Sequence, residues 1–144
     1  MMFEHEDGNP ILKLDDEQSW KLIDSTKHGR LVVTVAGEPD IFPVNYAASG
    51  RKLFLRTAPG NKLAELTINS KVLFETDGIL SEEAWSVVLR GTARVLDQSA
   101  DIAEAEALGL KPWVPTLKDF YVEITPTSVS GRHFQFGEHP EREI

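Results

Sequence analysis

Alternation of apolar and polar side chains is the most regular feature of this sequence and predicts mainly β-structure. It is clearest between Trp85 and Leu96, where every second residue is apolar or glycine and the residues between them are mostly polar or charged. Because successive side chains of a strand point to opposite faces, this segment predicts a long central strand buried on one face. Apolar and β-branched runs bounded by turn residues predict five further strands, over residues 31–35, 41–47, 52–56, 71–77 and 120–125.

Three short helices interrupt the predicted strands. Asp15 followed by Gln18 is the pattern of a helix N-cap with its capping-box partner. A second helix is expected over residues 62–68, and a third is expected to begin with Ser99 as its cap. Six strands joined mostly by turns, with few helices, favour an antiparallel barrel over a parallel βαβ sheet.

Length and composition indicate one globular domain. The chain has 144 residues, of which 41% are hydrophobic and 26% charged, and this is enough apolar material for a core. We therefore expect residues 1–144 to form a single domain, with residues 1–13 and 137–144 as loose polar tails.

The charge and the missing residue types argue against several classes of function. With 23 acidic and 15 basic side chains the net charge is −8, and the basic residues do not cluster, so we expect no nucleic-acid partner. No apolar run is long enough to span a bilayer and the N-terminal segment lacks a signal-peptide pattern, so we expect a cytoplasmic protein without membrane association. Cysteine is absent and the four histidines have no metal-ligand spacing, so no metal site is expected.

Residues 56–62 combine several groups that bind phosphate. Arg56 offers a two-pronged guanidinium, Thr57 a hydroxyl and Lys62 an ammonium. The Pro59-Gly60 turn precedes the start of a helix, where backbone amides attract anions. The segment therefore predicts an anion cradle, although the same spacing also allows two solvated charges beside an ordinary strand-to-helix turn.

Pro43, Val44 and Asn45 form a second candidate segment. A proline inside a strand indicates an edge or a bulge, where backbone groups are free to contact a ligand, and Asn45 provides both donors and acceptors. An edge strand that binds no ligand explains the same residues.

Four single residues are further candidates. Trp85 and Ser86 begin the long strand, where the indole also fits the core and the serine also fits the surface. His133 and Tyr46 are candidates to exchange a proton with a substrate, although a lone histidine is more often structural.

The order of these segments resembles the small flavin-binding split barrels of the pyridoxamine 5'-phosphate oxidase-like superfamily. The blocks that carry the resemblance are Gly29-Arg30-Leu31-Val32-Val33, Pro39-Asp40-Ile41-Phe42-Pro43-Val44-Asn45-Tyr46, Phe54-Leu55-Arg56-Thr57 with Gly60 and Lys62, Val72-Leu73-Phe74-Glu75, Trp85-Ser86-Val87-Val88-Leu89-Arg90-Gly91, and Ile124-Thr125-Pro126 with Val129-Ser130-Gly131-Arg132. The resemblance covers roughly residues 15–136, and no single block would suffice.

The resemblance implies a mainly β fold, a six-stranded antiparallel split β-barrel of the FMN-binding type, which works as a homodimer. It assigns eight cofactor residues: Arg56, Thr57 and Lys62 at the FMN phosphate, Pro43, Val44 and Asn45 along the isoalloxazine, and Trp85 and Ser86 from the partner subunit. The implied function is that of an FMN-dependent oxidoreductase acting on an unknown small molecule. The resemblance equally allows F420 or haem as the cofactor, and a non-catalytic flavin-binding or flavin-storage protein is the alternative function.

Overall fold

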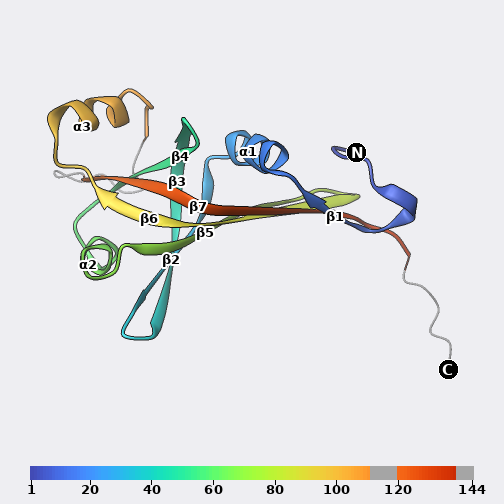
Figure 1. Cartoon of the computed structure of the whole chain (residues 1–144), viewed down its shortest axis with the longest axis horizontal. Coiled ribbons are helices and arrows are strands. Elements are labelled where there is room, and N and C mark those ends of the chain that lie inside the picture. The colour runs from blue at the N-terminus through green and yellow to red at the C-terminus, as the bar shows by residue number, and fades with distance from the viewer. Residues whose placement is uncertain (111–119, 139–144) are drawn as a thin grey trace.

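The strands form a closed antiparallel ring with one extra strand outside it. The computed structural model describes residues 1–110 and 120–138 (Figure 1). Its strands lie in the order β1-β7-β4-β3-β2-β5-β6, and β6 pairs again with β7, so β2 to β7 close into a ring. The six-stranded antiparallel split barrel predicted from the sequence is confirmed, and β1 is added to it.

The observed elements contain the strands expected over residues 31–35, 41–47, 52–56, 71–77 and 120–125. The strands are β1 (Ile11–Leu14), β2 (His28–Val35), β3 (Glu38–Ser49), β4 (Lys52–Thr57), β5 (Lys71–Ile79), β6 (Glu83–Val95) and β7 (Phe120–Gln135). The helices are α1 (Asp16–Ser25), α2 (Asn61–Ile68) and α3 (Ser99–Glu106), and a 3-10 turn, η1, spans Glu6–Gly8.

Alternate side chains of each strand fill the interior of the ring. The alternation predicted for β6 is confirmed, because Trp85, Val87 and Leu89 are buried while Arg90 and Thr92 are exposed. The side chains with no exposed surface include Leu31, Val33, Leu53, Phe74, Val87, Leu89, Val122 and Ile124. Their removal from water is the main stabilising contribution to the barrel. The opposite face of the strands is called the outer face below.

Two tight turns fix the register of β3 against its neighbours. Ala36 and Gly37 have φ values of 51° and 78°, and Gly50 and Arg51 have 58° and 56°. Two consecutive residues with positive φ are typical of the type I′ turn, whose twist matches that of antiparallel strands. The first turn therefore lies at Ala36 and Gly37, and Pro39 and Asp40 already belong to β3.

The ring is split between β3 and β4. β3 pairs with β2 from Glu38 to Asn45 and with β4 from Tyr46 to Ser49. Over its first half, β3 thus has a paired neighbour on one side only within the described residues. Within the described part of the chain, the backbone groups on the open side of this edge therefore have no strand to bond with.

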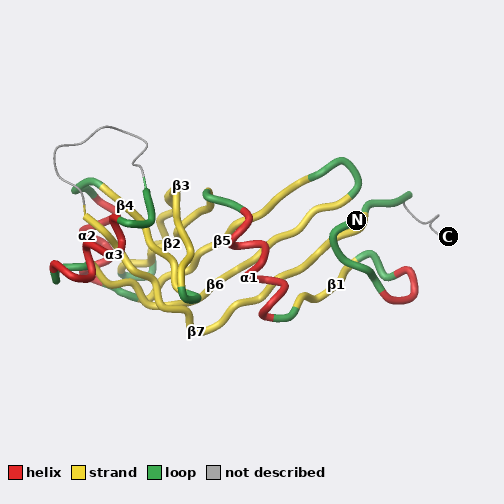
Figure 2. The backbone as a smooth tube through the Cα atoms, turned by 90° about the horizontal axis from the view of Figure 1, so that it is seen from above, coloured by secondary structure: helices red, strands yellow, loops and turns green. Residues whose placement is uncertain are grey.

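β5, β6 and β7 continue beyond the ring as an arm. β5 pairs with β2 only over Val72–Glu75, whereas it remains paired with β6 as far as Ile79. The arm comprises residues 76–87, 129–135 and 11–14, and Figure 2 shows it extending away from the barrel on one side.

The N-terminal segment is ordered on this arm, so the loose tail expected over residues 1–13 is wrong. Ile11–Leu14 forms β1 and pairs with residues 131–134 of β7, and Phe3 packs against the core. A four-residue strand is too short for periodicity to reveal, and its partner lies more than a hundred residues away in the sequence. Asp15 and Gln18 form the predicted capping box, which starts α1 directly after β1.

The remaining differences from the expected elements are local. β7 continues past residue 125, where the sequence pattern predicts its end. The strand tolerates Pro126 because this proline lies at a bulge, where β6 and β7 shift register. Ser99 is the first residue of α3 and does not cap it. Residues 139–144 of the second expected tail lie outside the described residues. None of the helices in the described part of the chain has the length and apolar character needed to cross a membrane.

Candidate functional site

The split between β3 and β4 gathers most of the predicted cofactor residues. Tyr46 of β3 pairs with Leu55 of β4. The segment Pro43–Asn45 comes directly before Tyr46, and Arg56 and Thr57 come directly after Leu55. The strands separate at that pair, so the two groups lie on opposite sides of the opening. The two groups are at least eleven residues apart in the sequence, and the topology brings them to one place.

The side chains at the split point in two directions. Pro43, Asn45 and Arg56 occupy positions of the outer face, whereas Val44 and Thr57 point into the barrel and are 4% and 7% exposed. The Thr57 hydroxyl donates to the carbonyl oxygen of Ala58 at 3.3 Å. Val44 and Thr57 therefore offer a ligand their backbone groups rather than their side chains.

Arg56 is held in place by contacts with Leu110 and Tyr121. Its Nη1 donates to the carbonyl oxygen of Leu110 at 3.0 Å, and its guanidinium carbon lies 5.9 Å from the centre of the Tyr121 ring. A guanidinium carries five N–H donors in a fixed fork, so Arg56 can keep these contacts and bind an anion as well.

Lys62 and the start of α2 lie on the β3 side of the split. The Lys62 ammonium is 5.9 Å from the centre of the Phe42 ring, and burial lowers the pKa of Lys62. Gly60 precedes α2 and gives it no side-chain cap, so the first amides of this helix are not satisfied by a capping side chain. A phosphate would accept bonds from these amides and favour the charged form of Lys62.

Trp85 and Ser86 lie in the arm, far from the split of the same chain. Trp85 is 4% exposed and packs on Gly78, where an added Cβ would lie 2.5 Å from the indole nitrogen. Ser86 is on the outer face and pairs with Arg132 of β7. Arg56 pairs with Tyr121 of the same strand, eleven residues away. At about 3.3 Å per residue the separation is roughly 35 Å, so one chain does not unite Arg56 with Ser86.

His133, one of two candidate proton donors, is fully buried beneath the N-terminal segment. Its Nδ1 is 2.5 Å from Nε2 of His5, and its Nε2 is 2.9 Å from a carboxylate oxygen of Glu83. The backbone amide of Met2, and secondarily His133, lower the pKa of Glu83. His133 thus ties the N-terminal segment to the arm. His5 and Glu83 carry no local sequence signal, since only non-local pairing brings them to His133.

Tyr46, the second candidate proton donor, points into the barrel. Its hydroxyl donates to the carbonyl oxygen of Ile23 at 2.6 Å and bonds with the hydroxyl of Thr26. Burial raises the pKa of Tyr46. These contacts join the end of α1 to β3, which is a structural role.

A cleft of about 1500 Å³ opens beside the split. It lies between α1 and β3, and the residues that follow α3 form another of its walls. Of the predicted cofactor residues, Asn45 lines it. The space is therefore continuous with one side of the split.

Arg30, Glu75 and Asp77 form a charged cluster on the outer face. Nη1 of Arg30 lies 3.1 Å from Glu75 and 3.2 Å from Asp77. Burial, and next the neighbouring Asp77, raise the pKa of Glu75 to about 7 against the opposing effect of Arg30. The sequence pattern gave no indication of this cluster.

The stability of the fold should depend on the protonation of Glu75. Its pKa in the folded protein is raised from 4.5 to about 7, so its stabilising contribution is full below about pH 4.5 and is lost as the pH rises through 7. We expect the free energy of unfolding to fall between about pH 5 and pH 8, and to fall less in Glu75→Gln. Urea unfolding across this range measures how the free energy of unfolding of each protein changes with pH. The same change in both proteins would contradict the raised pKa of Glu75.

Comparison with known proteins agrees with this architecture. The family model described as pyridoxamine 5'-phosphate oxidase matches residues 15–133. The uncharacterized protein Rv3129 of Mycobacterium tuberculosis is 42% identical over 93 residues, which cover 65% of this chain and 84% of Rv3129.

Solved structures show the same fold at similar identity. The FAD binding protein from Mycobacterium smegmatis has a TM-score of 0.77 and 41% identity, and the match covers 88% of this chain and 100% of that one. The conserved protein of unknown function DIP1874 from Corynebacterium diphtheriae has a TM-score of 0.76 and 43% identity, with 88% and 99% covered. With its barrel and most of its length matched, this chain belongs to the pyridoxamine 5'-phosphate oxidase family.

Proposed function

We propose that this chain is an FMN-dependent oxidoreductase whose flavin occupies the split between β3 and β4. The observation that carries the proposal is the edge of β3 at Pro43–Asn45, which has no strand partner on this side among the described residues and faces Arg56 across the opening. Family membership supports it, because the family model covers every one of these residues.

The residues at the split fit the parts of FMN. Arg56, Lys62 and the amides at the start of α2 supply positive charge and N–H donors for the phosphate. The backbone edge at Val44 and the Asn45 amide supply donors and acceptors for the polar edge of the ring system. Bound flavin would carry the electron transfer, while the protein provides binding and orientation. Neither Tyr46 nor His133 reaches the outer face, so this assignment requires neither as a proton donor.

The proposed functional unit is a homodimer. Ser86 lies roughly 35 Å along β7 from Arg56 of its own chain, so the Ser86 near a given flavin comes from a second copy. A two-fold axis would create two equivalent sites of this kind. The small-molecule substrate would then bind where barrel and partner arm meet.

FAD is a competing cofactor with a specific observation in its favour, because the Mycobacterium smegmatis relative with 41% identity is an FAD binding protein. The cleft beside Asn45 would accommodate the larger dinucleotide. F420 and haem compete with flavin as the cofactor, and flavin storage competes with catalysis as the function. An absorption spectrum separates the cofactor classes, and bleaching of bound flavin by NAD(P)H separates an enzyme from a carrier.

Arg56→Ala is expected to weaken FMN binding by about 10- to 150-fold. The variant loses one charge-assisted hydrogen bond to the phosphate, worth about 1.5 to 3 kcal/mol. Wild-type protein should bind FMN more tightly than riboflavin, and the variant should lose most of this difference. Quenching of flavin fluorescence during titration measures the affinities of wild type and Arg56→Ala for FMN and for riboflavin.

Riboflavin is the internal control for this variant, because Arg56 also bonds to the carbonyl of Leu110. Damage to the fold would weaken FMN and riboflavin binding alike, whereas loss of a phosphate contact would weaken FMN alone. Unchanged FMN affinity in Arg56→Ala would make Arg56 a structural strand-end charge and remove the assigned cradle.

A further inference from the structure

A line of three hydrogen bonds joins the N-terminal segment to the arm. It starts at the carbonyl oxygen of Asn9, which lies 2.7 Å from Nδ1 of His5. It continues from Nε2 of His5 to Nδ1 of His133 at 2.5 Å, and ends where Nε2 of His133 lies 2.9 Å from Oε1 of Glu83. The line therefore connects residues 2–9, which we call the strap, to β6 and β7.

The two ends of this line fix the number of hydrogens that it holds. The carbonyl of Asn9 only accepts hydrogen bonds, and so does an ionised Glu83. Each of the three bonds needs one hydrogen, whereas two neutral imidazoles carry only one N–H each. The intact line therefore requires one extra proton, which gives the pair of His5 and His133 a single positive charge.

Glu83 balances this charge. The backbone amide of Met2, and secondarily His133, lower the pKa of Glu83, which keeps its carboxylate ionised. The carboxylate lies 2.9 Å from His133, whose side chain has no exposed surface. A buried charge is tolerated where a counter-charge and hydrogen bonds accompany it. The buried pair can thus hold the extra proton.

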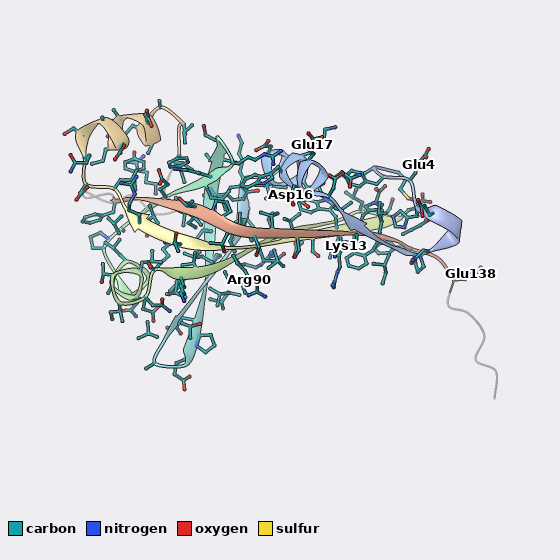
Figure 3. All side chains as sticks on the ribbon, in the orientation of Figure 1. Glu4, Lys13, Asp16, Glu17, Arg90 and Glu138 are labelled. Atoms are coloured by element: carbon teal, nitrogen blue, oxygen red, sulfur yellow. The ribbon has the colours of Figure 1, made fainter. Side chains whose placement is uncertain are left out.

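The elements around the pair carry mainly acidic side chains. Those of the strap, of the turn before β6 and of the first turn of α1 are Glu4, Glu6, Glu82, Asp16 and Glu17. The cations Lys13 and Arg132 are paired with each other next to His133 in the strand order, and alternation turns them to the opposite face. Figure 3 shows this separation, with Glu4, Asp16 and Glu17 above the sheet and Lys13 below it. These surroundings favour a positive charge on the pair.

Loss of the extra proton would break the line. One of its three bonds would be left with two acceptors facing each other and no hydrogen between them. Water cannot reach the fully buried His133 to replace the lost bond, so the unpaired group would cost free energy. His5 is only half-buried and can regain its hydrogen bonds in solvent, which requires the strap to move away from the arm.

The strap also forms part of the cleft beside the split, because Met2 and Phe3 line that cleft. The Phe3 ring packs edge-on against the ring of His133, with 5.3 Å between their centres, and the amide of Met2 donates to Glu83 at 2.9 Å. Movement of the strap would therefore change the wall of the cleft.

We propose that the strap is a pH-operated latch, held on the arm while His5 and His133 share one extra proton and released when that proton leaves. The held form binds one proton more than the released form. The ratio of held to released molecules therefore falls by up to about 10-fold for each unit rise in pH. Histidine side chains change charge between about pH 5 and pH 8, so release is expected in this range.

Nuclear magnetic resonance of the 15N-labelled full chain tests the latch without any added ligand. At about pH 6 the chemical shifts of the four ring nitrogens of His5 and His133 should show three that carry a hydrogen. As the pH is raised to about 8.5, one N–H should be lost, and the backbone of the strap should become mobile in the same step. The amides of β6 should stay ordered and serve as the internal reference.

Three variants separate the latch from a merely structural contact. His5→Gln still offers an N–H to His133 but cannot hold the extra proton, so the order of the strap should be lower and independent of pH. Glu83→Gln removes the counter-charge and should lower the pH of release by about one unit or more. His28→Gln removes an exposed histidine of β2 outside the strap and should behave like wild type.

Several results would overturn the proposal. An ordered strap with only two ring N–H hydrogens would do so, as would a wild-type strap that stays ordered up to about pH 9. The same pH of release in wild type and Glu83→Gln, or the same pH dependence in wild type and His5→Gln, would reduce the line to a structural contact. Loss of order in β6 together with the strap would assign the change to unfolding of the whole chain and equally reject a latch.

Discussion

Val88→Glu is expected to yield a monomer that no longer binds flavin. Val88 lies on the outer face of β6, between Glu75 of β5 and Ser130 of β7. In the proposed homodimer this face is covered by the second copy, so each introduced carboxylate would lose water without gaining a partner. A cost of about 3 kcal/mol corresponds to more than 100-fold weaker association. Sedimentation with parallel FMN titration should show that dimer and flavin binding are lost together.

Two companion variants separate the interface from the sheet itself. Val88→Glu also places a carboxylate opposite Glu75 of the same chain, which is locally destabilising. Val88→Lys places a cation opposite Glu75, which is locally favourable, and should still dissociate the dimer. The uncharged Val88→Thr should leave the dimer intact. A wild-type monomer at micromolar concentration that binds FMN fully would reject the shared site, and so would a Val88→Lys dimer with normal flavin affinity.

Gly91→Ala should cause the largest loss of stability among single-methyl additions on β6. A Cβ at Gly91 would lie well inside 3.0 Å of the carbonyl oxygen of Thr125, and 3.2 Å from Ile124. This carbonyl belongs to the backbone of β7, so β6 and β7 must separate at the bulge to make room. We expect the free energy of unfolding to fall by about 3 kcal/mol, measured by urea denaturation at a fixed protein concentration.

Gly137→Ala is the matched control, because no atom lies within 4 Å of an added Cβ there and its φ lies outside the left-handed region. It should leave the unfolding free energy unchanged. If Gly91→Ala is as stable as Gly137→Ala, then β6 and β7 are not held at the described spacing beside the bulge.

Strands with strong local patterns could be predicted from the amino-acid sequence alone. Six strands and the start of α1 follow from alternation between Trp85 and Leu96, from apolar runs between turn residues, and from the Asp15 capping box. These signals are readable because period-two burial and end-capping act between residues that are close in the chain. The order of the blocks likewise led to the family, and with it to the candidate residues of the split.

The sequence does not say where the candidate side chains point or which of them lie close together; only the three-dimensional structure does. Trp85 was a candidate for the flavin, and the structure places its indole in the core, whereas Ser86 next to it faces outward. Alternation gives two faces but does not say which one a ligand contacts. The burial of His133 under His5 likewise depends on a segment for which the sequence pattern predicted a loose tail.

Non-local strand pairing produced the remaining features. The split exists because β3 changes partner at Tyr46, and Lys13 lies beside Arg132 because β1 pairs with β7. A shift of one residue in either register would turn these side chains to the opposite face. Register depends on the closing of the whole barrel, whose energy is spread over contacts between residues far apart in the chain, so no local pattern in the sequence contains it.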